Sequence, residues 1–554
     1  MQKILRALII VAMLITTWLL VMAWQKDYSG VEQNATQDTR VTTTGDLPSV
    51  NSNGDLPASV VQPNASVAAS VDKQLINVST DLYDIKINPV GGDVVFASLK
   101  DYDAKLNSNN PFVLLEEGNN RVYLAQSGLV GQNGIDTEQG RAKYEYISSN
   151  YVMAGDEETL SVPLTYSKDG ITITKTFTFT QGKYPIDVSY NVNNNSANTW
   201  QGQMFAQLKR DDSKDPGMAD KGVLSMATFL GGAYGTPDDD YSKLKFGKFN
   251  DGELNNIATE DGWVAIIQHY FVAAWTPSDN ITAKLFSKQT ENNNIIGFTS
   301  EPLTVSSGTQ KTFSAKLYTG PKVQDKLENF APGFEKTVDY GWAWPISKFL
   351  FTILSGIHSF VGNWGWSIIG LTLLVKLVLF PISHKSYMSM AKMRAIAPKL
   401  QAIKDEHGDD RMAQSQAMMA LYKEEKVNPM AGCLPLLAQM PIFLGLYYML
   451  VESIELRHAP WIGWIQDLSS MDPLFILPIF MGVSMFVQQM LNPQPTDPMQ
   501  AKVMKFMPIM FAGFMLFFPA GLVLYWTVNN LSSMAHQYYV NKKVEKDYIA
   551  TTAS

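Results

Sequence analysis

Residues 364–383 read Trp364-Gly-Trp-Ser-Ile-Ile-Gly-Leu-Thr-Leu-Leu-Val-Lys-Leu-Val-Leu-Phe-Pro-Ile-Ser383, an apolar stretch with one charge, Lys376. A helix of this length rises about 30 Å, which is the thickness of a bilayer core. The stretch therefore predicts a membrane span over 364–383. A lone ammonium in such a helix costs roughly 2.5–3.5 kcal/mol on insertion scales, so it usually has a task or a polar partner. Lys376 is the first candidate functional residue.

Charge and hydropathy divide the 554 residues into two parts. Residues 1–330 hold 27 of the 44 basic and 37 of the 52 acidic residues, a net charge of −10, while the remaining 17 and 15 give +2. The second part also holds nearly all the long apolar runs. We expect an acidic soluble domain followed by a membrane domain, without direct nucleic-acid recognition. The single cysteine, Cys433, excludes a disulfide framework within one chain.

The N-terminal segment is basic first and apolar second, with Lys3 and Arg6 before an apolar run from Ala7 to Trp24. This order fits a signal peptide cleaved after Val21-Met-Ala23, or an uncleaved anchor with its N-terminus in the cytoplasm. The length of the run favours a transmembrane anchor over 1–24. Residues 25–70 are rich in Thr, Ser, Asn, Gly and Pro and predict a flexible linker.

Residues 71–330 carry strand signals. Ile171–Thr180 alternates, with isoleucines and phenylalanines on one face and threonines on the other. The apolar run Trp263–Trp275 suits one strand buried on both faces, and we interpret its His269 as a core histidine. The pattern predicts a large antiparallel β-sandwich. It shows no phosphate loop, catalytic set or metal-ligand spacing, so we expect no catalytic residue, metal or cofactor. The hypothesis that the sandwich binds a sugar or a peptide is supported by fold analogy alone.

Two helical segments flank the first core span. Residues 334–362 predict an amphipathic helix in the membrane interface, with a helix packed on the sandwich as the alternative. Residues 384–427 predict a helical hairpin outside the membrane, with apolar spacing at Met393, Ile396, Leu400 and Ile403. Its methionines adapt to varied partners, although ordinary hairpin packing also explains them. The hairpin residues with a possible partner-binding role are Met393, Arg394, Met418 and Met419.

Four further apolar segments follow, at 428–451, 472–490, 503–518 and 520–540, and bring the expected number of spans to six. Basic residues concentrate in the loop 384–428, which has eight, and in the tail 541–554. The loop 452–472 has only Arg457. By the positive-inside rule, both termini and the hairpin lie in the cytoplasm, and the sandwich lies outside, in the periplasm of a Gram-negative cell.

Other polar side chains besides Lys376 are expected at membrane depth. Thr372 lies one turn away, and Gln439, Gln488, Tyr525 and Asn529 fall in other spans. Such groups normally face a bundle interior or a watery cavity. Snorkelling of Lys376 to the inner interface is the alternative. Because the spans hold no carboxylate apart from Asp472 at an outer end, we expect a visiting negative group as the partner of Lys376.

Several motifs in this order resemble one family. They are Tyr387-Met-Ser-Met-Ala-Lys-Met-Arg394, Lys426-Val-Asn-Pro-Met-Ala-Gly-Cys433, Gln439-Met-Pro-Ile-Phe-Leu444, Thr496-Asp-Pro-Met499 and Gly521-Leu-Val-Leu-Tyr525. Together they resemble the YidC membrane protein insertases of Gram-negative bacteria, over residues 340–540. The anchor and the large exported sandwich match the same subgroup.

The resemblance implies a five-span core with a hydrophilic groove that is open to the cytoplasm and lipid. Lys376 matches the groove's basic residue, which is commonly arginine, and Trp526 stands where relatives often have a second groove tyrosine. The implied function is insertion and folding of newly made inner-membrane proteins, alone or with the Sec translocon. The implied partners are nascent membrane proteins, the ribosome and targeting machinery, and the bilayer. The short tail after Lys546 departs from tails that bind ribosomes.

Two other functions fit parts of the pattern. A transporter or channel would use Lys376 as an anion site, although the five core spans show no repeated halves. A membrane-anchored sugar-binding or enzymatic sandwich would use the spans only as an anchor. The resemblance covers several separate motifs in one order, so we favour an insertase rather than an enzyme.

Overall fold

The computed structural model describes residues 47–48, 74–137, 140–218, 228–252, 254, 257–278, 281–290, 292–408, 410–425, 427–428, 434–492 and 498–552. The chain forms two compact units, residues 1–338 and 339–554. The anchor predicted over 1–24 and nearly all of the linker predicted over 25–70 lie outside the described residues.

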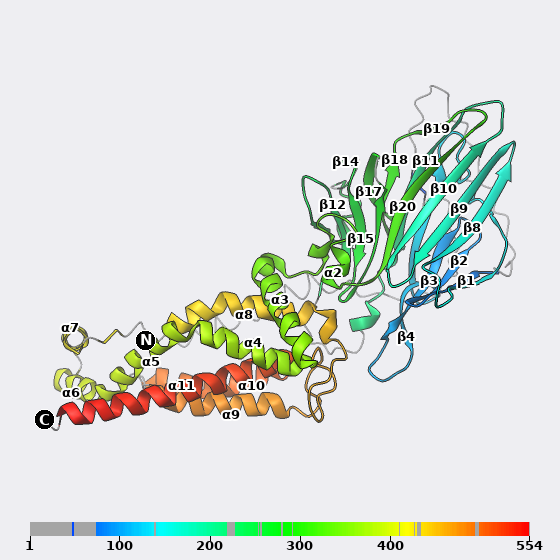
Figure 1. The fold of residues 1–554 in the computed structure, drawn as a ribbon. Coiled ribbons are helices and arrows are strands. Elements are labelled where there is room, and N and C mark those ends of the chain that lie inside the picture. The colour runs from blue at the N-terminus through cyan, green and yellow to red at the C-terminus, as the bar shows by residue number, and fades with distance from the viewer. Residues whose placement is uncertain are drawn as a thin grey trace. The chain divides into compact units, whose positions relative to one another are not determined.

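The first unit is built on two large sheets whose neighbouring strands are almost all antiparallel (Figure 1). Among the described residues, the eleven-stranded sheet contains β1 (Ile76–Ser79), β2 (Tyr83–Asn88), β3 (Asp93–Asp103), β4 (Pro111–Glu117), β5 (Val122–Val130), β7 (Asn150–Val152), β11 (Trp200–Arg210), β14 (Ile257–Thr259), β17 (Ala283–Thr290), β18 (Asn293–Ser300) and β19 (Leu303–Val305). The nine-stranded sheet contains β6 (Glu145–Tyr146), β8 (Thr159–Lys168), β9 (Ile171–Thr180), β10 (Pro185–Asn194), β12 (Gly231–Gly235), β13 (Ser242–Leu244), β15 (Trp263–Ile267), β16 (Phe271–Pro277) and β20 (Thr309–Pro321). The predicted antiparallel sandwich is confirmed.

The alternation seen in the sequence sets the packing of β9. Ile173, Phe177 and Phe179 are almost fully buried, whereas the threonines between them are only partly buried. Period-two alternation places these apolar side chains on the same face of the strand. Lys175 lies on that same face and is also fully buried. The alternation itself puts residue 175 on the inward face, although the sequence analysis did not single out this charge.

The prediction of one strand over Trp263–Trp275 is wrong. The segment is a hairpin in which β15 and β16 pair antiparallel, with Gln268–Tyr270 as the turn. The backbone N–H of Gln268 donates to the carbonyl of Phe271, and that of His269 donates to the Asp215 carboxylate at 2.9 Å. Both strands and His269 are buried. Burial on both sides of the turn produced a continuous apolar run that hid the reversal.

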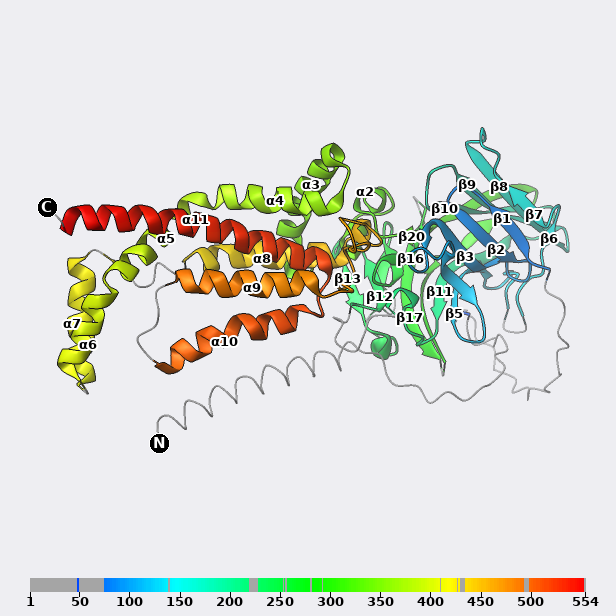
Figure 2. The same ribbon diagram turned by 90° about the horizontal axis from the view of Figure 1, so that it is seen from below.

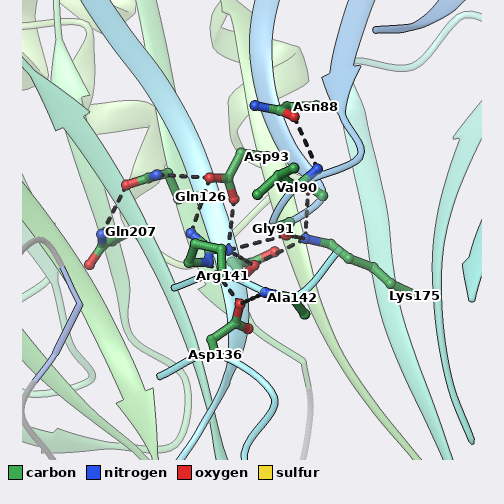
Figure 3. Close-up of polar contacts among 12 residues, drawn as sticks. Asn88, Val90, Gly91, Asp93, Gln126, Asp136, Arg141, Ala142, Lys175 and Gln207 are labelled. Atoms are coloured by element: carbon green, nitrogen blue, oxygen red, sulfur yellow. Dashed lines mark hydrogen bonds and ion pairs between the residues drawn. The ribbon is translucent and has the colours of Figure 1, made fainter. Parts of the chain in front are cut away.

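A buried ionic network centres on Arg141 (Figure 3). Its guanidinium donates to both carboxylate oxygens of Asp93, at 2.9 and 3.0 Å, and to Asp136 at 2.8 Å. Burial by itself lowers the pKa of Arg141, but the two carboxylates outweigh it and raise the pKa above its ordinary value. Gln126 donates to Asp93, and Gln207 donates to Gln126. The charges are therefore paired and hydrogen-bonded, as burial requires.

Lys175 connects the two sheets through this network. Its ammonium reaches from β9 to the carbonyls of Gly92 at 2.7 Å and of Gly91 and Ser127 at 3.1 Å each, all on the other sheet's chain segments. Gly91 and Gly92 have φ of 80° and 62°, and a Cβ on Gly92 would lie 2.9 Å from the Lys175 side chain. Glycine is thus needed both for the left-handed turn and for the close approach.

The second unit is helical. The short helix α2 (Gln324–Leu327) precedes it, at the end of the first unit. The α-helices of the second unit are α3 (Trp344–Val361), α4 (Trp364–Val378), α5 (Phe380–Ala395), α6 (Ala397–His407), α7 (Arg411–Glu424), α8 (Leu434–Glu452), α9 (Ile476–Leu491), α10 (Pro498–Met515) and α11 (Ala520–Thr552). Helix α11 packs against α4, α5 and α9 (Figures 1 and 2). It runs without a break through residue 540, where a tail was expected to begin.

The predicted span 364–383 is divided between two helices. Helix α4 ends at Val378, Leu379 caps it, and α5 begins at Phe380 with Pro381 in its first turn. Proline disfavours helical backbone in the residue before it and has no N–H to continue the helix. The two helices meet at a bend of 68°. Within the described part of the chain, only this bent pair meets a length and apolarity criterion for crossing a membrane, and no unbroken helix does.

Helix α3 packs through only part of its apolar surface. Its buried residues are Ser347, Leu350, Phe351 and Leu354. The hydroxyl of Ser347 donates to the carbonyl of Gly445 on α8 at 2.9 Å. Phe349 and Phe360, by contrast, are 65% and 92% exposed. Helices α3 and α8 approach closely at Gly445, and this contact requires a small residue at that position. That requirement determines which face of α3 is packed.

Arg141→Met should destabilise the sandwich by about 3–5 kcal/mol, because two carboxylates would remain buried without a counter-charge. Urea unfolding of a fragment of residues 74–338 measures this. The matched control is Lys336→Met, which breaks a more exposed pair, Lys336–Asp240, at 2.8 Å and should cost no more than about 1 kcal/mol. Equal losses in the two variants would contradict the role given to Arg141.

Lys175 should make the stability of the sandwich depend on pH. Burial lowers the pKa of Lys175 to about 7, from an ordinary 10.5. Between these values the unfolded chain binds more protons, so this contribution to stability increases as pH rises from 7 towards 10. The difference in unfolding free energy between wild type and Lys175→Met should therefore grow with pH over this range. Parallel pH profiles for the two proteins would show that Lys175 stays protonated when buried.

Candidate functional site

Three helices bring polar side chains together around Lys376. The ammonium on α4 donates to the Ser533 hydroxyl of α11 at 2.7 Å and to the Gln439 side-chain oxygen of α8 at 3.4 Å. Lys376 is half-buried, and among the described residues it makes no ion pair. The Lys376 cluster, defined as Lys376, Gln439, Tyr525, Asn529 and Ser533, thus holds one cation with neutral oxygen acceptors.

Gln439 is the connecting residue of the Lys376 cluster. Its amide nitrogen donates to the Tyr525 hydroxyl at 3.1 Å and to the side-chain oxygen of Asn529. The Ser533 hydroxyl in turn donates to the backbone carbonyl of Asn529 at 2.7 Å. Tyr525, Asn529 and Ser533 are buried. Since every member is hydrogen-bonded, the chain of contacts fixes α4, α8 and α11 relative to one another at this depth.

Four of the residues predicted from the sequence, Lys376, Gln439, Tyr525 and Asn529, lie in the cluster. Thr372 does not join them, because its buried hydroxyl donates to the carbonyl of Ile368 in its own helix at 2.6 Å. Trp526 makes no hydrogen bond to the Lys376 cluster within the described residues. Its ring packs edge-on against Phe443, with 4.7 Å between ring centroids, and at a tilt against Phe511, with 4.9 Å between ring centroids.

Gln488 on α9 is half-buried and, among the described residues, has no hydrogen bond to the Lys376 cluster. Ser533 was missed by the sequence analysis. A signal was present, because Tyr525, Asn529 and Ser533 are spaced by four residues and therefore share one face of a helix. Serine is common in helices. The spacing of four residues therefore becomes informative only when a charged side chain is known to lie next to it.

The hairpin methionines divide between packing and exposure. Met393 and Met418 pack against the hairpin core of Ile396, Leu400, Leu421 and Val427. Met419 is 55% exposed, and Arg394 is exposed as well. The first hairpin helix is interrupted at Ile396, so α5 and α6 are separate and α6 packs on α7. Packing in the hairpin core therefore accounts for two of the three candidate methionines.

Comparison with known proteins assigns both units to one family. Residues 75–353 match the YidC periplasmic domain, and residues 356–547 match the 60Kd inner membrane protein family. The membrane protein insertase YidC of Pseudomonas aeruginosa (strain LESB58) is 47% identical over 98% of this chain and 98% of its own length. The chain belongs to the YidC family. The YidC of Pseudomonas syringae pv. syringae (strain B728a) is 48% identical over the same shares of both chains.

A solved structure of an active YidC insertase aligns with 85% of this chain and 93% of its own, at 18% identity and a TM-score of 0.38. The family assignment rests on the sequence relatives. As a YidC protein, the chain is an inner-membrane protein with a periplasmic domain. The YidC family is one of insertases rather than of enzymes, and the transporter or channel alternative is not favoured.

Ser533→Ala should lower the thermal unfolding temperature of the full chain in detergent, because it removes the 2.7 Å contact to Lys376 without adding bulk. A buried hydrogen bond to a charged group contributes about 1.5–3 kcal/mol. Ser532→Ala, one residue away and only half-buried, is the matched control. A shift of the same size in both variants would argue against the Lys376 cluster as a structural unit.

Proposed function

We propose that this protein inserts newly made inner-membrane proteins through a hydrophilic groove among α4, α8 and α11. The observation that carries the proposal is the Lys376 ammonium, held by neutral side chains of two other helices. A cation with neutral acceptors keeps its full charge for an incoming group. In this view, the polar and acidic segment of a substrate enters from the cytoplasm, approaches Lys376 and then leaves to the periplasm.

The proposed topology has six spans, with both termini and the hairpin in the cytoplasm and the sandwich in the periplasm. Eight basic residues in the loop 384–428 support it. In the proposed core, α4 with the start of α5, α8, α9, α10 and α11 cross the bilayer. The bend at Leu379 would mark the place where the first core span leaves the membrane on the cytoplasmic side.

The exposed rings of Phe349 and Phe360 support an interfacial position for α3, because an isolated soluble helix rarely leaves such side chains in water. The exposed Met419 and Met412 on α7 support a partner-binding surface on the hairpin. We place nascent membrane proteins first among the partners. The Sec translocon, the ribosome and the targeting machinery follow from the family alone.

The driving force needs no nucleotide. Burial of a substrate's apolar span in lipid supplies about 25 cal/mol per Å² of apolar surface. The groove shortens the low-dielectric path that the substrate's hydrophilic segment must cross, which lowers the desolvation cost. A membrane potential, positive outside, draws acidic groups outward by about 2.3 kcal/mol per charge per 100 mV.

Lys376→Arg should retain insertion, whereas Lys376→Ala and Lys376→Glu should slow insertion of a substrate with an acidic translocated segment, by about tenfold for Glu. The reason is that Glu replaces attraction by repulsion at the same position, and each 1.4 kcal/mol changes an equilibrium tenfold. Protease protection of a newly made single-span test protein in proteoliposomes measures insertion.

The design has two controls. Lys385→Glu changes an exposed charge that is outside the Lys376 cluster and should leave insertion unchanged. A matched substrate whose translocated aspartates are replaced by asparagines should lose its sensitivity to residue 376. If Lys376→Glu inserts the acidic substrate at the wild-type rate, the proposed groove charge is wrong.

A further inference from the structure

A pocket of about 540 Å³ lies outside the Lys376 cluster, between the C-terminal parts of α5, α9 and α11. Its volume falls within the range of about 300–1,000 Å³ that is usual for small-molecule sites. Ala391 and Ala395 form the α5 wall, and their small side chains leave the space open. In the proposed topology, this pocket opens at the cytoplasmic surface of the membrane.

The pocket carries charges of both signs. Arg394 from α5 and Lys542 from α11 are exposed cations, and Glu545 lies one turn beyond Lys542. None of the three makes an ion pair within the described part of the chain. Two cations and one carboxylate that face one space without pairing are complementary to a ligand that itself carries both signs.

One wall of the pocket is preformed by hydrogen bonds between α11 and the end of α9. Asn541 donates from its amide nitrogen to the carbonyl of Leu491 at the end of α9, at 3.3 Å. Its side-chain oxygen is buried and has no hydrogen-bond partner. One turn earlier, Gln537 donates to the Asn492 side chain at 2.8 Å. These contacts hold α11 to the end of α9.

An exposed apolar stripe on α9 leads towards the pocket. Leu491 lines the pocket, and the stripe before it consists of large apolar side chains at helical spacing, Ile476, Ile479, Phe480, Val483, Phe486, Val487 and Met490. Tyr538, at the pocket's edge, is 58% exposed, and tyrosine is favoured at the level of lipid headgroups. A ligand that fits both the stripe and the pocket has an apolar tail and a zwitterionic head.

We propose that this pocket binds the headgroup of a phosphatidylethanolamine molecule from the inner leaflet. The phosphodiester lies between Arg394 and Lys542, the ammonium reaches Glu545, and an acyl chain lies along the α9 stripe. Basic pockets between helices on the cytoplasmic side commonly hold lipid headgroups. The carboxylate in this pocket selects an ammonium-bearing headgroup over a purely anionic one. The assignment rests on the membrane placement proposed above but not on the Lys376 groove.

The test is a lipid titration of the purified full chain in detergent, followed by native mass spectrometry that counts bound phosphatidylethanolamine. Arg394→Ala with Lys542→Ala should weaken binding of the first lipid at least tenfold. The matched control changes the neighbouring exposed lysines, Lys392→Ala with Lys543→Ala, which lie outside the pocket lining, and should change binding less than twofold. An equal loss in both pairs, or a loss in neither, overturns the proposal.

Selectivity gives a second measurement. Wild-type protein should prefer phosphatidylethanolamine to phosphatidylglycerol, and Glu545→Gln should remove that preference while phosphatidylglycerol binds as before. A wild-type preference for phosphatidylglycerol overturns the choice of headgroup. If the double variant binds lipid as the wild type does but no longer binds an acidic peptide, the pocket is a protein-binding site and the proposal is wrong.

Folding of each variant is checked by its thermal unfolding temperature in detergent. Should the double variant unfold, the single changes Arg394→Gln and Lys542→Gln carry the same comparison, each with an expected loss of about threefold. Lipid binding is measured without a substrate, whereas the groove is tested by insertion. Failure of one proposal is therefore distinguishable from failure of the other.

Discussion

The helical unit depends on one constraint, which is that polar groups in an apolar bundle must satisfy one another. Lys376, Gln439 and Ser533 meet this constraint across three helices separated by long stretches of sequence. Each contact is modest alone, but a buried donor left without an acceptor costs about 1–3 kcal/mol, and more when it is charged. The helices can therefore not slide or rotate independently at this depth without exposing an unpaired group to the apolar surroundings.

The same constraint applies in the sandwich, where the buried groups that need partners carry formal charges. Arg141 neutralises two carboxylates, and Lys175 is held by backbone carbonyls that only a Gly-Gly turn can bring so near. Its alternating strands were predictable, because a period of two follows directly from the strand backbone. The same period puts Lys175 on the buried face, but its partners were not predictable, because they are backbone carbonyls and a carbonyl leaves no trace in the identity of a residue. The β15–β16 turn was hidden for a related reason, since burial made the turn residues resemble the strands.

The candidate site was recovered from the sequence to the extent that polar side chains in apolar stretches need partners. Lys376, Gln439, Tyr525 and Asn529 were identified in this way, and they meet. Thr372 was misleading because a hydroxyl in a helix can return its hydrogen bond to its own backbone. Ser533 was missed because a small hydroxyl next to a polar helix end is unremarkable until Lys376 is seen beside it. The helices and their approximate bounds could be predicted from periodicity. The break before Pro381 could be located only in the structure.

The flexible stem of Lys376 has a further consequence. Its neighbours fix the ammonium through one short hydrogen bond and one longer contact, both to neutral atoms. An arginine would present a planar fork that favours one approach and two aligned oxygens, whereas an ammonium attracts from any direction. In the proposed groove, such a site would set no register along a passing chain. It would recognise that a segment is acidic without recognising which sequence carries the acid, which is the tolerance that a general route into the membrane requires.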